Sequence, residues 1–155
     1  MRKQINSIFV YLFFIACWIF FFYFYPYHLH YKEQITLCVL QPDFLQTYLQ
    51  KPAFLTEICG DYLTQFFLWT GGGSSILTLT FVFTWLGLRI ALRKTGITSH
   101  VSLWALLPIV AEWALSCHLE YPLSMSLGLM CSVWAFSLST LSTSTHTRGI
   151  LHVVM

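Results

Sequence analysis

Residues 8–25 read IFVYLFFIACWIFFFYFY, an unbroken run of apolar and aromatic side chains. With the two residues before it, the run has about the 20 residues that an α-helix needs to cross the roughly 30 Å hydrocarbon layer of a membrane. Two basic residues, Arg2 and Lys3, precede it. The run ends in Tyr25 and Pro26 without a small-residue cleavage motif, so we expect an uncleaved membrane anchor rather than a signal peptide.

The composition of the chain excludes an ordinary water-soluble domain. Hydrophobic residues make up 57% of the sequence and charged residues only 9%, against roughly 25% charged residues in a typical soluble domain. The net charge of +2 gives no support to nucleic-acid binding. We therefore expect the lipid bilayer to be the main partner of this protein.

Three further apolar segments have about the length of a membrane span. We predict an all-α integral membrane protein with about four transmembrane helices, in a single transmembrane domain over residues 1–155. The outer loop covers residues 26–72, and the expected spans are 6–25, 73–92, 101–117 and 123–141. Pro108 is expected to kink the third span, and the glycines at 71–73 to form the corner where the chain turns into the second.

Basic residues flank these spans on one side only. Six of the eight Lys and Arg residues fall on that side: Arg2, Lys3, Arg89, Arg93, Lys94 and Arg148. No acidic residue lies among them. Clusters of Lys and Arg stay in the cytoplasm during membrane insertion. We therefore expect both termini to be cytoplasmic.

The outer loop shows two amphipathic patterns. Apolar residues recur at helical spacing in 42–50 and again from Ala53 to Trp69, which predicts two helices lying on the outer leaflet. Tyr25, Tyr27 and Trp69 suit the interface, where an aromatic ring can lie in the apolar layer and keep its polar atom in water. The fourth span is rich in small residues, so we expect it to pack against other transmembrane helices or a second copy of the chain.

Glu112 is the one acidic residue within an expected span. A charge at the centre of a bilayer costs about 2.5–3.5 kcal/mol on insertion scales, which makes this residue a functional candidate. A structural role is the competing interpretation, because a carboxyl near the outer surface can reach water or sit protonated against a Ser or Thr of a neighbouring helix. Glu33 and Asp43 are the other candidate catalytic acids.

Imidazole and carboxylate groups also gather on the outer side, where they could share a metal or act as acid and base. Their spacing matches no specific metal motif, so we expect neither a metal site nor a cofactor from these residues: His28, His30, His118 and Glu120. The glycine run lacks the Gly-Lys-Ser/Thr that a phosphate-binding loop needs. Five cysteines cannot all pair, and whether Cys38 and Cys59 form a disulfide stays open.

Three segments of the outer loop resemble a known family: HYKEQ at 30–34, PDFLQTYLQKP at 42–52 and LTQFF at 63–67. Together they resemble the N-terminal part of an uncharacterised family of bacterial multi-pass inner-membrane proteins. Its members have a Pro-Gly-Gly-like turn where this chain has Pro52-Ala53-Phe54. The resemblance implies a bacterial inner-membrane location. Because members are several times longer, it also implies that this chain corresponds to a fragment of a larger protein.

Two functional hypotheses follow. The first is a multi-pass membrane protein of unknown biochemical activity whose outward-facing amphipathic loop interacts with a partner or with lipid. The alternative is part of a polytopic glycosyltransferase-like enzyme, with Glu33 or Asp43 as the base and a lipid-linked sugar as donor. The sequence does not decide whether the protein is an enzyme.

Overall fold

The computed structural model describes residues 2–36, 46, 48–97 and 99–141, and within these ranges every regular element is a helix. Helix α1 covers Arg2–Ile19 and continues as a π-helical segment, η1, over Phe20–Phe24. The buried side chains of α1 and η1 recur every three or four residues, so they share one face of the helix. They are Val10, Phe14, Cys17 and Phe21. Large apolar side chains also cover the outward stripe: Ile8, Phe9, Leu12, Ile15 and Ile19.

Helix α2, Pro26–Ile35, turns sharply away from α1. The two helices are bent by 75° at Tyr25. Pro26 occupies the first turn of α2, where its fixed φ fits and its missing N–H costs nothing. Helix α2 therefore leaves the direction of α1 just after Phe24.

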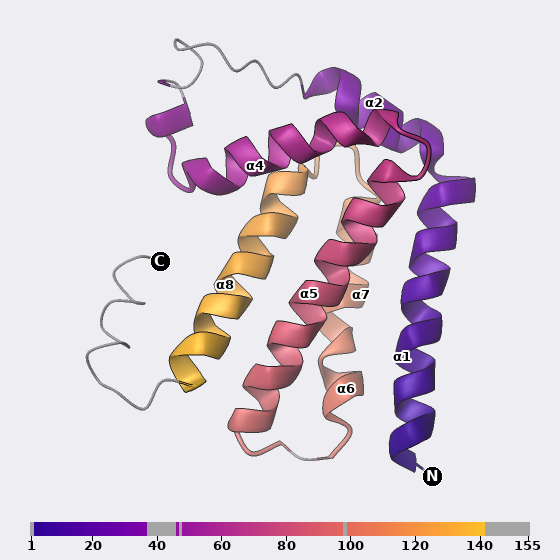
Figure 1. Ribbon diagram of the computed structural model, residues 1–155, viewed down its shortest axis with the longest axis vertical. Helices are drawn as coiled ribbons and strands as arrows, with labels where there is room; N and C mark the ends of the chain where they lie inside the picture. Colours follow the sequence, from indigo (N-terminus) through magenta and orange to yellow (C-terminus); the bar gives the residue numbers. More distant parts are fainter. Residues whose placement is uncertain (1, 37–45, 47, 98, 142–155) are drawn as a thin grey trace.

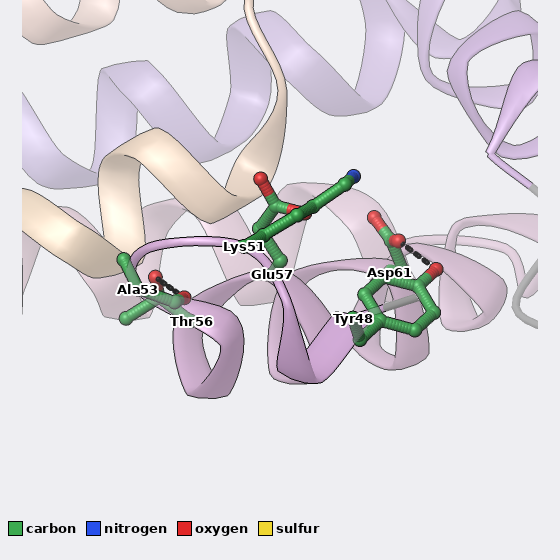
Figure 2. A network of polar contacts seen from close by, with 6 residues as sticks. All are labelled: Tyr48, Lys51, Ala53, Thr56, Glu57 and Asp61. Atoms are coloured by element: carbon green, nitrogen blue, oxygen red, sulfur yellow. Dashed lines mark hydrogen bonds and ion pairs between the residues drawn. The ribbon is translucent and has the colours of Figure 1, made fainter. Parts of the chain in front are cut away.

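Helix α4, Phe54–Thr64, and the short 3₁₀ helix η2, Gln65–Leu68, lie where the sequence predicted the second amphipathic helix. Ala53 precedes α4 in the left-handed region, with φ 63°. Its carbonyl accepts from the Thr56 hydroxyl, and the Tyr48 hydroxyl donates to Asp61, so the preceding segment is tied to α4 (Figure 2). The first predicted amphipathic helix, 42–50, falls mostly outside the described residues.

Helix α5, Gly72–Lys94, occupies the centre of the bundle and contacts α1, α7 and α8. Gly71, the residue before α5, is in the left-handed region, with φ 80°, which glycine adopts without steric cost. The expected corner at the glycine run is therefore confirmed. Two buried threonines within α5, Thr80 and Thr84, donate to the carbonyls one turn earlier, of Ile76 and Thr80, so their hydroxyls are satisfied within an apolar environment.

The segment predicted as one span at 101–117 is divided in two. Helix α6 covers Val101–Trp104 and α7 covers Leu106–Ser116. Pro108 accounts for the break, because a proline ring clashes with the carbonyl four residues earlier and removes one hydrogen bond. That carbonyl belongs to Trp104, the last residue of α6. The expected kink is present and falls just before the proline.

Helix α8, Leu123–Leu141, completes the bundle and has the bounds expected from the sequence. Figure 1 shows α1, α5, α7 and α8 running side by side, with α2 and α4 crossing one end. We call α2, α4 and η2 the cap. The start of α1, the turn between α5 and α6, and the end of α8 all lie at the opposite end (Figure 1).

The described residues contain two helices long and apolar enough to cross a membrane, α5 and α8, or three when the bent pair of α1 and α2 is counted as one span. The apolar segment Val101–Ser116 is shorter. The predicted fold class, an all-α protein with membrane-spanning helices, is therefore confirmed.

Candidate functional site

Lys32 of α2 is unusual for a basic residue, because its side chain is buried. Only 8% of its surface is exposed. Its ammonium group donates to the backbone carbonyls of Ser116, at 2.9 Å, and Tyr121, at 3.0 Å. Lys32 thus joins the cap to the end of α7 and to the turn that leads into α8.

These two acceptors explain part of the position of Lys32. The last four carbonyls of a helix have no partner within it, and the C-terminal end of a helix carries partial negative charge. Ser116 is the last residue of α7. A lysine ammonium placed there satisfies a carbonyl that has no partner within the helix, and it interacts favourably with the helix dipole.

A cavity of about 260 Å³ opens beside Lys32. It lies between the cap, α5 and the turn from α7 to α8, and its lining residues are Lys32, Ile35, Thr36, Thr64, Phe67, Leu77, Ser116, Leu119, Glu120, Tyr121, Pro122, Leu123 and Ser126. We call it the Lys32 cavity. Ser116 and Ser126 are 1% and 0% exposed, and their hydroxyl oxygens have no hydrogen-bond partner among the described residues. Buried hydroxyls without partners are uncommon and call for an explanation.

Glu112 lies one turn before Ser116 on α7 and is 2% exposed. Both of its carboxyl oxygens are buried without a hydrogen-bond partner in the part of the chain that the structure describes. Ser126 of α8 lies close enough to act on both the Glu112 carboxyl and the Tyr121 phenol, yet it forms no hydrogen bond of good geometry. The structure therefore brings an acid, a phenol and unpaired hydroxyls to the same end of the α7–α8 pair.

Burial changes the acid–base properties of the groups around the cavity. It lowers the pKa of Lys32 from 10.5 to about 8, because a low-polarity environment disfavours the ammonium form. Burial also raises the pKa of the Tyr121 phenol, and the nearby Ser126 hydroxyl partly offsets this increase. The pKa of His28 is lowered by burial and by the positive charge of Lys32. Charged and neutral forms of Lys32 are therefore both accessible near pH 8.

The catalytic acids proposed from the sequence have different surroundings. Glu112 is buried next to the cavity, as described above. Glu33 is half-buried on α2, but it is not among the residues that line the Lys32 cavity. Asp43 lies outside the described residues. The glycosyltransferase-like alternative therefore gains no support from the position of Glu33.

The candidate metal ligands do not gather in one cavity. Glu120 lines the Lys32 cavity, and His30 lines a second one, of about 220 Å³, between α2 and the glycine run. His28 and His118 line neither of these two cavities, although His28 lies close to the backbone of His118. Across the described ranges, no three His, Cys, Asp or Glu residues are grouped closely enough to hold a metal ion. Cys38 lies outside these ranges, and its pairing with Cys59 is not described.

Sequence reasoning missed Lys32, Ser116 and Ser126. One signal for Lys32 was present, because it and Lys51 are the two basic residues that the positive-inside pattern leaves on the outer side. No comparable signal marked the serines, since small residues in a span are usually explained by close helix packing.

Comparison with known proteins identifies a family but no activity. The family described as "Family of unknown function (DUF6057)" matches residues 1–155. No curated protein and no solved structure gives a significant match to the chain.

Proposed function

We propose that this chain, which belongs to the DUF6057 family over residues 1–155, is a multi-pass membrane protein whose cap faces outward and interacts with the membrane surface. The family has no assigned reaction, so the proposal rests on the arrangement of side chains. In it, both termini are cytoplasmic, the membrane is a bacterial inner membrane, and the cap contacts the head groups of the outer leaflet.

The observation that carries the proposal is the difference between the two ends of the bundle. Aromatic side chains are exposed at the cap end, with Tyr23 at 70%, Tyr27 at 88% and Trp69 at 67% exposure. Basic side chains, Arg93 and Lys94, are exposed at the end of α5 on the other side. Aromatic rings prefer the membrane interface and basic residues prefer the cytoplasmic flank. This polarity supports an outward-facing cap.

The apolar outer surface of the bundle supports insertion into lipid. On α1, Ile8, Phe9 and Leu12 are each more than half exposed, at 57%, 57% and 58%. On α7, Leu107 is 60% exposed. Contiguous apolar surface of this kind is costly in water but matches the hydrocarbon layer.

Cysteine labelling tests the orientation. Cys59 is exposed on α4 of the cap, and Thr95 is exposed at the end of α5. Two variants are compared: one keeps Cys59 alone, and the other carries Thr95→Cys as its single cysteine. In intact spheroplasts, a membrane-impermeant maleimide is expected to label Cys59 directly and the Thr95→Cys variant only after permeabilisation.

Labelling after denaturation gives the total reactive thiol in each variant and serves as the control for expression. The opposite pattern, with Thr95→Cys labelled in intact spheroplasts and Cys59 protected, would reverse the orientation and overturn the proposal. Release of the chain from membranes in buffer without detergent would refute membrane insertion itself.

A further inference from the structure

We propose that the Lys32 cavity binds a phosphate group, carried either by a lipid head group or by a small soluble phosphate. The proposed function enters only through the outward-facing cap, which sets the side of the membrane from which the ligand arrives. Binding itself depends on three features of the cavity: its buried positive charge, its unpaired hydroxyls and a helix N-terminus.

The positive charge of Lys32 is incompletely compensated. An ammonium group has three N–H donors, and two of those of Lys32 meet neutral backbone carbonyls. In the described ranges the only ion pair within 4.0 Å joins Lys51 and Glu57, so no described carboxylate reaches Lys32. Burying an ammonium without an opposite charge is costly. An oxyanion in the cavity would supply that charge.

Two of the four Ser and Thr residues that line the cavity are available as donors. Thr36 and Thr64 donate to the carbonyls of Lys32 and Gly60 within their own helices. Ser116 and Ser126, in contrast, are almost fully buried, and their hydroxyls have no hydrogen-bond partner within the described ranges. Each hydroxyl can donate one hydrogen bond. An oxyanion beside Lys32 would satisfy both.

The start of α8 adds a third anion-binding feature. Pro122, Leu123 and Ser126 line the cavity, and α8 begins at Leu123. The first N–H groups of a helix lack partners within it, and the dipole of the helix makes this end favourable for anions. The unpaired Ser126 hydroxyl in the first turn provides the independent evidence that this N-terminus faces a ligand.

The chemistry of the cavity favours phosphate over other anions. A phosphate group offers several acceptor oxygens in different directions, which suits a lysine on one side and two serines with a helix N-terminus on the other. The volume of about 260 Å³ is below the roughly 300 Å³ at which drug-sized pockets begin, so it suits a head group. Glu120 is exposed at the rim, where it can face an ammonium group on the same ligand.

The whole chain is purified in dodecyl maltoside, and binding is measured as the increase in Tm that inorganic phosphate produces. Sodium chloride of equal ionic strength provides the reference Tm. Phosphate is expected to stabilise the unmodified protein. The apparent Kd is expected to rise about 10-fold or more in Lys32→Met and about 3- to 10-fold in Ser126→Ala, from the usual strength of hydrogen bonds to charged groups.

Matched variants separate binding from folding. Lys51→Met removes an exposed lysine of the outer loop and is expected to leave the apparent Kd unchanged. Ser126→Ala removes only one oxygen, so it keeps the test valid if Lys32→Met fails to fold. The proposal would be overturned if inorganic phosphate stabilised the unmodified protein no more than chloride did and if phospholipids were also retained no better than diacylglycerol. Equal binding by Ser126→Ala and the unmodified protein would also overturn it.

A second set of measurements identifies the source of the phosphate. Native mass spectrometry compares retention of phosphatidylglycerol and phosphatidylethanolamine with retention of diacylglycerol, which lacks the phosphate. Retention of the phospholipids that falls in Ser126→Ala assigns the site to a lipid head group, whereas stabilisation by inorganic phosphate without lipid retention assigns it to a soluble phosphate. Because detergent exposes both sides of the protein, these results do not depend on the labelling experiment.

Discussion

Replacing Gly60 with alanine tests how closely the cap packs on the bundle. Gly60 is buried on α4, where α4 crosses the start of α8. A Cβ atom at this position would lie 2.7 Å from the backbone nitrogen of Ser124 and 2.8 Å from its Cα. Non-bonded carbon atoms normally approach to about 3.5–4.0 Å, so α4 would have to move away from α8 by roughly 1 Å.

The magnitude follows from two opposing terms. Overpacking a close contact costs about 1–3 kcal/mol, and here the clash involves backbone atoms, which cannot rotate away. Alanine also stabilises a helix by about 1 kcal/mol relative to glycine. Gly128 of α8 provides the matched control, because a Cβ there meets nothing within 4 Å. Since the helix term is common to both variants, Gly60→Ala should be less stable than Gly128→Ala by about 1–3 kcal/mol.

Thermal unfolding in detergent measures this difference. At about 2–4 °C per kcal/mol for a chain of this size, the Tm of Gly60→Ala should fall roughly 2–12 °C below that of Gly128→Ala. The labelling rate of Cys59, one residue away, should rise in Gly60→Ala and not in Gly128→Ala. Equal Tm values and equal labelling rates would show that α4 does not rest on α8 as described.

Three further predictions concern single residues. Ala53→Gly should raise stability by about 1 kcal/mol, seen as a higher Tm, because Ala53 holds a left-handed conformation that costs an L-residue about 1–2 kcal/mol; an unchanged Tm would contradict this conformation. Ile109→Ala should cost about 2–5 kcal/mol, because this side chain is 0% exposed. Leu107→Ala, on the 60% exposed face of the same helix, should cost far less, and a comparable loss would contradict the packing of α7. The pKa of Lys32, lowered from 10.5 to about 8, predicts a pH dependence. Below about pH 8, Lys32 is protonated in both the folded and the unfolded state, so its effect on stability does not change with pH. Above about pH 8, Lys32 loses its proton in the folded state while it stays protonated in the unfolded state. The free energy of unfolding should therefore rise between about pH 8 and 10, by at most about 1.4 kcal/mol per pH unit. Lys32→Met should abolish this component in pH-dependent thermal unfolding, since the neighbouring titratable groups remain in both proteins: His28, Cys117, Glu120 and Tyr121. A rise of equal size in Lys32→Met would refute the assignment.

The sequence predicted well those helices whose apolar pattern lies within one continuous segment. The expected spans 73–92 and 123–141 agree closely with α5, Gly72–Lys94, and α8, Leu123–Leu141. A run of about 20 apolar residues has few structural alternatives when the polar backbone must satisfy its own hydrogen bonds in lipid. The start of α4 near Ala53 was predicted for a similar reason, from a local amphipathic pattern.

Helix α2 could not be predicted in the same way. Its sequence, PYHLHYKEQI, has no continuous apolar stripe, and only Leu29 and Lys32 are buried. Its position depends on contacts with η2 and α5, which are distant in sequence. The division of 101–117 into α6 and α7 was anticipated only as a kink, because the effect of Pro108 on the preceding turn depends on how the neighbouring helices support it.

The candidate site was predictable from the sequence at Glu112, because an acid within an apolar run is conspicuous, and at Glu120, which was a candidate metal ligand and lines the cavity. Lys32 reaches Ser116 and Tyr121 across 84 and 89 positions of the chain. No local pattern reports such a pairing. Ser126 was interpreted as a small packing residue, and the structure places it against the cavity instead.

The position of Lys32 can be compared with what a purely structural role would require. Closing the end of α7 needs only two N–H donors for the carbonyls of Ser116 and Tyr121, which a neutral amide side chain could provide without burying a charge. A structural role also gives no reason for the unpaired hydroxyls of Ser116 and Ser126 in the same cavity, because each costs about 1–3 kcal/mol when left unsatisfied. The charge and both hydroxyls are explained together if an oxyanion occupies the cavity. The effect of Ser126→Ala therefore distinguishes the two roles, since it leaves both hydrogen bonds of Lys32 intact.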